Sequence, residues 1–85
     1  MILSLAEAAG LFLVFSVDVE RQKIVGTQDG KNYIIYVDKH SRYENDFFKK
    51  EFDKLLARKY IKVKAAGTID EVGNIKASIL QDVEQ

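Results

Sequence analysis

The fold is decided by residues 47–65, FFKKEFDKLLARKYIKVKA, where the spacing of the apolar side chains changes. Apolar residues first recur every three or four positions, at Phe48, Phe52, Leu55 and Leu56. They then alternate with Lys62 and Lys64, at Ile61, Val63 and Ala65. The first spacing is typical of one face of a helix, and the second of one face of a strand. We therefore predict an amphipathic helix over residues 47–59, followed by a strand over residues 60–65.

Three further strands are predicted ahead of this helix. Residues 11–20 are β-branched and aromatic and alternate toward their end, so their odd positions are expected to face the core. Residues 23–27 and 33–38 form the next two β-prone runs. Asp29 and Gly30 lie between these runs and supply the positive φ angles of a tight hairpin. The three strands are expected to form an antiparallel meander.

The N-terminal end allows two interpretations. Ser4 and Glu7 have the spacing of a capping box, and the alanines between and after them favour a short helix over Leu5–Ala9. The alternative is a strand that starts at Ile2.

The tail is also ambiguous. Ile75, Ala77 and Ile79 alternate with polar residues, which predicts a strand paired back onto residues 60–65. The alternative is a helix begun by a second capping box over residues 68–71, but the Gly-Asn pair at 73–74 favours a turn. We prefer the hairpin.

Together these elements predict an α+β fold with a single small domain over residues 1–85. An antiparallel sheet of about five strands, a three-strand meander and then a C-terminal hairpin, packs against one main amphipathic helix. A short N-terminal helix is an optional addition. The predicted core consists of Phe15, Val17, Val19, Ile35, Val37, Phe48, Phe52, Leu55, Leu56, Ile61 and Val63.

Chain length points to a partner. The 85 residues include no cysteine, so neither a disulfide nor a thiolate zinc site can stabilise the domain. A domain of this size buries only about 60% of its unfolded surface. A sheet with two open edges and a single helix leaves apolar surface uncovered. We expect a second copy, in a homodimer, or another protein to cover it.

The apolar first seventeen residues do not fit a targeting or membrane segment. A signal peptide begins with a basic region, whereas no Lys or Arg precedes Arg21. A membrane span needs about 20 apolar residues, and Glu7 interrupts a shorter stretch. We expect a cytoplasmic protein without a membrane contact.

The sequence lacks the residues of a catalytic centre. His40 is the sole histidine and is expected to be a solvated loop residue, since a general base needs an orienting partner. Asp18 and Glu20 share a strand face, which is typical of a solvated surface rather than a metal site. The glycines never take the spacing of a phosphate-binding loop. We therefore predict no enzyme activity, no cofactor, no metal and no small-molecule substrate.

One window is strongly basic although the formal net charge of the chain is zero. Cations are expected on one face of the helix and on the following strand, where they can contact phosphates of DNA or RNA. A solvated helix face explains the same residues, and zero net charge is unusual for a dedicated nucleic-acid binder. The candidate nucleic-acid-binding residues are Lys50, Lys54, Arg58, Lys62 and Lys64.

These patterns favour one function and keep one alternative. The favoured function is a small non-catalytic protein-interaction domain, acting as a homodimer or as an adaptor or regulatory subunit. The alternative is a nucleic-acid-binding module that uses the basic helix face and the following strand.

Overall fold

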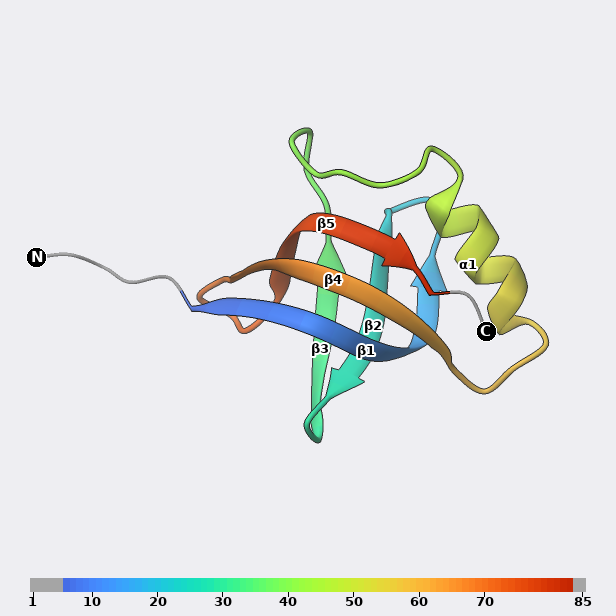
Figure 1. The fold of residues 1–85 in the computed structure, drawn as a ribbon, viewed down its shortest axis with the longest axis horizontal. Coiled ribbons are helices and arrows are strands. Elements are labelled where there is room, and N and C mark those ends of the chain that lie inside the picture. The colour runs from blue at the N-terminus through green and yellow to red at the C-terminus, as the bar shows by residue number, and fades with distance from the viewer. Residues whose placement is uncertain (1–5, 84–85) are drawn as a thin grey trace, which may run out of the picture.

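The computed structural model describes residues 6–83 and forms five strands and one helix from them (Figure 1). The predicted α+β combination of a sheet with one packed helix is confirmed. In chain order the elements are β1 (Glu7–Asp18), β2 (Lys23–Gln28), β3 (Lys31–Tyr36), α1 (Phe47–Leu55), β4 (Ile61–Ile69) and β5 (Ile75–Asp82).

The sheet closes into a small barrel, in the order β1-β2-β3-β5-β4 and back to β1. The predicted meander and the C-terminal hairpin are both present. The prediction of a purely antiparallel sheet with open edges was wrong, because β3 pairs with β5 in parallel and β1 pairs with β4. A three-strand meander, a helix and a hairpin closed in this order have the connectivity of OB-fold barrels.

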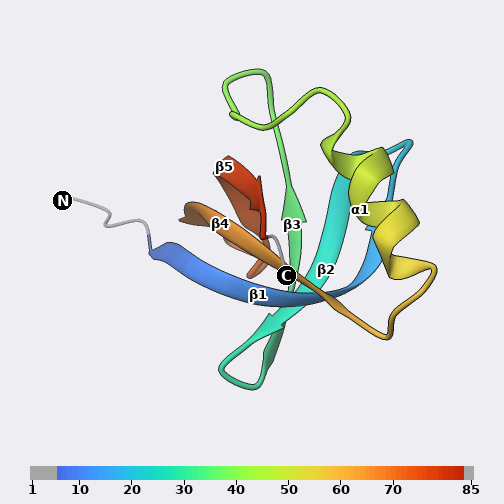
Figure 2. The same cartoon turned by 45° about the vertical axis from the view of Figure 1, so that its right-hand side comes forward.

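Closure depends on the length of β1. This strand has twelve residues, and its first eight pair with β4 while its second half pairs with β2. In Figure 2, β1 curves from alongside β4 to alongside β2. The predicted helix over Leu5–Ala9 was therefore wrong from Glu7 onward, since a five-residue helix is too short to compete with a long ladder. Ser4 and Leu5 lie outside the described residues.

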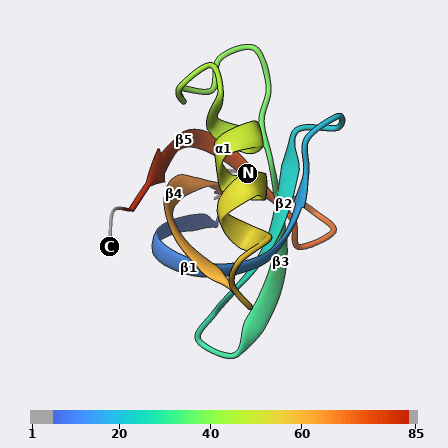
Figure 3. The same ribbon diagram turned by 90° about the vertical axis from the view of Figure 1, so that its right-hand side faces the viewer.

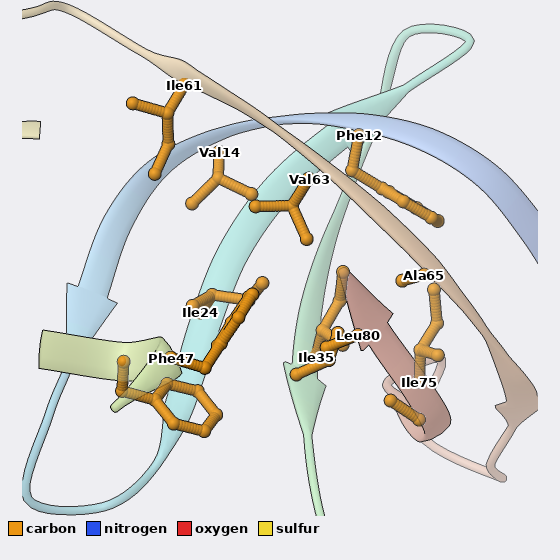
Figure 4. Packing of buried hydrophobic residues seen from close by; sticks show 12 residues of the cluster. Phe12, Val14, Ile24, Ile35, Phe47, Ile61, Val63, Ala65, Ile75 and Leu80 are labelled. Atoms are coloured by element: carbon orange, nitrogen blue, oxygen red, sulfur yellow. The ribbon is translucent and has the colours of Figure 1, made fainter. Parts of the chain in front are cut away.

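The core fills the barrel with side chains from all five strands and from α1 (Figure 4). Ile35, Phe48, Ile61 and Val63 are buried as predicted, and Val17, Val19 and Val37 are partly buried against them. Phe15 is not in the core but 45% exposed, and Phe12 and Val14 are buried in its place. The further buried residues are Ile24, Phe47, Ala65, Ile75, Ala77 and Leu80.

A β-bulge in β1 explains this exchange. Val14 pairs with Gly26 of β2, but the next partner, Val25, lies opposite Ser16 rather than Phe15. The extra residue reverses the alternation, so even positions face the core before the bulge and odd positions face it afterwards. The predicted alternation holds only for the second half of the strand.

Helix α1 lies across one end of the barrel (Figure 3). It buries Phe47, Phe48 and Glu51, and the rings of Phe47 and Phe48 meet edge to face with centroids 5.1 Å apart. Leu55 is partly buried, whereas Phe52 is 38% and Leu56 74% exposed, so placing these last two in the core was wrong. Because two adjacent phenylalanines fill the barrel end, the helix turns the face of Phe52 and Leu56 toward solvent.

The helix also ends earlier than predicted. Regular helix stops at Leu55, and the chain continues in turns, with the N–H of Arg58 donating to the carbonyl of Leu55 at 3.2 Å.

The two hairpin turns follow from their residues. Asp29 and Gly30 have φ angles of 51° and 79°, as the sequence predicts for the β2–β3 turn. In the β4–β5 turn, Asp70 accepts hydrogen bonds from the backbone N–H groups of Val72 and Asn74. This carboxylate ties the turn together, and the alternative C-terminal helix is excluded.

Candidate protein-interaction face

An apolar patch covers the outer face of β1, β2 and β3. Its members are Leu11, Leu13 and Phe15 of β1, Val25 of β2 and Ile34 of β3. Leu11 is 52%, Leu13 36%, Phe15 45% and Ile34 37% exposed, and Val25 is half-buried among them. Single exposed apolar residues are ordinary, but a cluster on one sheet face is typical of an interaction site.

Strand register places these side chains together. Val25 lies opposite Ile34 in the β2–β3 ladder, so the two share a face. Leu11 and Leu13 are two residues apart and face the same side of β1. The bulge then turns both Phe15 and Ser16 outward, opposite Val25. Phe15 continues the outward row of Leu11 and Leu13, and the bulge after it lets Val17 face the core, which an uninterrupted alternation from Leu13 would turn outward.

Cations border the apolar patch along β4. Lys62 is paired with Leu13 and Lys64 with Leu11 in the β1–β4 ladder, so both lysines share the outer face with the patch. Arg58 and Lys59 precede them in the loop before β4. We call these four residues the basic rim. All four are exposed, and none forms an ion pair with any residue from 6 to 83.

The five candidate nucleic-acid-binding residues thus fall into two groups. Arg58, Lys62 and Lys64 belong to the basic rim. Lys50 and Lys54 lie on α1 and are already paired with carboxylates: Lys50 Nζ is 3.9 Å from Glu44 Oε2 and 3.8 Å from Asp82 Oδ2. Lys54 binds Asp82 and Glu51. The structure does not bring the five together as one free basic face.

Glu51 is an acidic residue that sequence reasoning missed in the core. Its side chain is fully buried on the inner side of α1, and Lys54 Nζ lies 3.4 Å from its Oε1. Neither carboxylate oxygen accepts a hydrogen bond from the described residues. Burial, helped by the neighbouring Asp82 carboxylate and opposed by Lys54, raises the pKa of Glu51 to about 7. The signal was available, since Glu51 is one helical turn after Phe47 and Phe48.

Asp82 forms a charged cluster with Glu51 and Lys54, but its pKa is lowered rather than raised. Burial alone would raise the pKa of its carboxyl, yet the bond from Lys54 Nζ and the charges of Lys54 and Lys50 bring it below the ordinary value. The cluster joins α1 to the end of β5 and serves packing rather than an exposed site.

His40 lies in the exposed loop between β3 and α1, as predicted. Its backbone N–H donates to Asp38 Oδ1 at 2.9 Å, and the hydroxyl of Ser41 donates to the carbonyl of Ala77 at 2.6 Å. These bonds fix the loop against β5. The loop borders a shallow groove of about 550 Å³ with an alanine floor over β1, β4 and β5. Within residues 6–83, no three His, Cys, Asp or Glu side chains gather as metal ligands would.

The apolar patch was not predicted from the sequence. Strict alternation assigned Phe15 to the core and left Leu11 and Leu13 on the same inner side. The run from Leu11 to Phe15 is apolar on both faces, and this was the available signal that one of its faces lies outside the core.

Comparison with protein families, with characterised proteins and with solved structures found no match. Among the described residues, no helix is long and apolar enough to cross a membrane.

Proposed function

We propose that this chain is a non-catalytic protein-interaction domain that binds its partner through the apolar patch. The supporting observation is that five apolar side chains share one outer sheet face although the barrel core is already filled. Leu11, Leu13, Phe15 and Ile34 have no role inside the barrel, since each is more than a third exposed.

Burying these side chains supplies the driving force. Removal of apolar surface from water contributes about 25 cal/mol per Å². A few side chains at the centre of an interface carry most of its binding energy. Phe15 and Leu13 lie at the centre of the apolar patch and are the expected anchors.

A nucleic-acid-binding module remains the second candidate. It is favoured by the basic rim beside a sheet face that OB-fold barrels use for oligonucleotides. Connectivity alone does not assign function. The floor of the patch is aliphatic apart from Phe15, whereas single-stranded binders stack bases on several aromatic rings. The protein-interaction proposal therefore takes precedence.

The test is a differential capture from the cells that express the chain. The full-length protein carrying Leu13→Ser and Ile34→Ser is compared with the wild type and with a control carrying Val72→Ser. Val72 is 83% exposed and lies in the β4–β5 turn, outside the patch and the basic rim. We expect a bound protein that the control retains and the patch variant loses. Identical partner sets for all three proteins would contradict the proposal, as would nucleic acid as the sole patch-dependent species.

A further inference from the structure

We propose that the partner is a different protein, which places an apolar segment flanked by carboxylates on the apolar patch and the basic rim. This inference rests on the proposed function and names the chemistry of the partner. Three features of the barrel lead to it. Lysines lie beside the apolar patch, the strands of the same face carry few carboxylates, and the side chains of the patch are mostly aliphatic.

The border carries positive charge that the chain leaves uncompensated. Lys62 and Lys64 lie beside Leu13 and Leu11, one strand away from the centre of the patch. Their ammonium groups meet no carboxylate among residues 6–83, unlike Lys49, Lys50 and Lys54 of the helix. A partner that buries the patch brings its own border against these lysines. Carboxylates at that border gain attraction, and cations there are repelled.

The strands of this face offer a second copy of the chain few carboxylates. Strands β2, β3 and β4 contain no Asp or Glu, and β1 has them only at its two ends, Glu7 and Asp18. Asp18 is already bound to Arg21, with 3.2 Å between the charged atoms. In a two-fold dimer through this face, the lysines meet either each other or the uncharged outward row of β3, Asn32, Ile34 and Tyr36. The remaining carboxylates near the face, Glu20 and Asp29, lie in the turns at its ends. A different chain with carboxylates beside its apolar segment therefore fits this face better than a second copy does.

The floor favours a peptide over a nucleic acid. Leu11, Leu13, Val25 and Ile34 offer aliphatic contacts, which suit Leu, Ile or Phe side chains. Phosphates could use the basic rim, and Tyr60 is exposed beside it, but among the five side chains of the patch only Phe15 offers an aromatic ring to a base. At Leu13 and Val14 the backbone of β1 is paired with β2 on one side and with β4 on the other, so a partner over these residues contacts side chains rather than adding a strand.

The test uses two labelled peptides and the purified full-length chain. Both peptides have leucines and a phenylalanine at helical spacing; one carries glutamates on both flanks and the other lysines. Affinity is read from fluorescence anisotropy at low and high salt, with an oligothymidylate as a third probe. Sedimentation of the chain alone reports self-association.

Charge reversal of the basic rim provides the decisive variant. Lys62→Glu with Lys64→Glu is compared with Lys39→Glu with Lys49→Glu, which has the same net charge but lies away from the patch. We expect the wild type to prefer the glutamate peptide by about tenfold, as a few close charge pairs give. The preference should shrink in salt. The rim variant should prefer the lysine peptide, and the control should behave as the wild type.

Several results would overturn the inference. These are equal affinities for the two peptides, an equal effect of both charge-reversal pairs, tighter binding of the oligothymidylate, or a dimer that Leu13→Ser dissociates. These results can be distinguished from failure of the proposed function. A natural partner that depends on the patch but lacks Asp and Glu in its contact segment would contradict this inference alone. The absence of any protein that depends on the patch would contradict both proposals.

Discussion

Gly67 of β4 occupies a position where even a methyl group has no room. A Cβ at this position would lie 2.1 Å from the carbonyl oxygen of Lys76 and 2.8 Å from the Cα of Ala77, both backbone atoms of β5. The register of the β4–β5 hairpin shifts at this point, which lets the two strands approach closely. The glycine is required by space rather than by a positive φ angle.

We predict that Gly67→Ala lowers the free energy of unfolding by at least about 2 kcal/mol, because the clash with rigid backbone forces β4 and β5 apart. Urea unfolding followed by circular dichroism measures this loss. Gly30→Ala is the control, since its site is open and only its φ of 79° is strained. That change should cost about 1 kcal/mol. Equal losses for the two variants would show that the close approach at Gly67 is absent.

Glu51 makes stability depend on pH. Its pKa is raised from 4.5 to about 7 in the folded chain, chiefly by burial and then by Asp82. Between these values the folded state keeps a proton that the unfolded chain releases, so the free energy of unfolding falls as the pH rises through this window. Asp82, whose pKa is lowered, acts at the acidic end, where its protonation removes stability.

We predict that the wild type loses roughly 1–3 kcal/mol of stability between about pH 4.5 and pH 7, as a raised carboxyl pKa requires. Glu51→Gln should flatten this decline, because the amide cannot ionise. Urea unfolding of both proteins across the window measures the difference. A parallel decline in the variant would assign the pH dependence to other groups.

Among the structural elements, β1 decides both the core and the exposed face. Phe12 is completely buried and Phe15 is 45% exposed, and the bulge after Val14 lets Val17 face the core although it is two residues after Phe15. The Phe12 ring also meets Tyr33 edge to face, with centroids 5.9 Å apart.

We predict that Phe12→Ala costs about 3–5 kcal/mol, as the loss of a buried phenylalanine does. Phe15→Ala should cost below about 1 kcal/mol, in the range of a surface change. Thermal and urea unfolding of the two variants test which side of β1 faces the core before the bulge. A larger loss for Phe15→Ala would mean that the odd positions face the core along the whole strand, as predicted from the sequence.

The elements themselves could be predicted from sequence because each has a local signal. Periodicity located the helix and the later strands, and Asp29-Gly30 located the hairpin. The bulge could not be predicted, since one extra residue changes the facing of Phe15 without changing the composition of the strand. The buried face of α1 was also missed, because its orientation depends on the barrel end that Phe47 and Phe48 fill rather than on the apolar stripe through Phe52.

At the scale of the whole molecule, closure of the barrel could not be predicted from local sequence patterns. It depends on pairing between β1 and β4, which are separated by most of the chain, and on two residue pairs between β3 and β5. Closure removes the open edges on which a partner was expected. It leaves Leu11, Leu13, Phe15 and Ile34 exposed together on the outer face of β1, β2 and β3, with the basic rim beside them.

We predict that Leu13→Ser leaves folding intact, because Leu13 contributes to the outer face and not to the filled core. Its free energy of unfolding should stay within about 1 kcal/mol of the wild type while partner capture falls. Unfolding and capture are measured on the same preparation. A large loss of stability would mean that Leu13 is a core residue and that the face is not free.

Photo-crosslinking in the expressing cells tests the interaction face most directly. A photoreactive phenylalanine analogue replaces Leu13 in one version of the full-length chain and Val72, at the exposed β4–β5 turn, in another. We predict a discrete protein adduct from position 13, with Asp or Glu near the crosslinked residue of the partner, and no such adduct from position 72. Adducts at equal yield from both positions, or none from position 13, would contradict it.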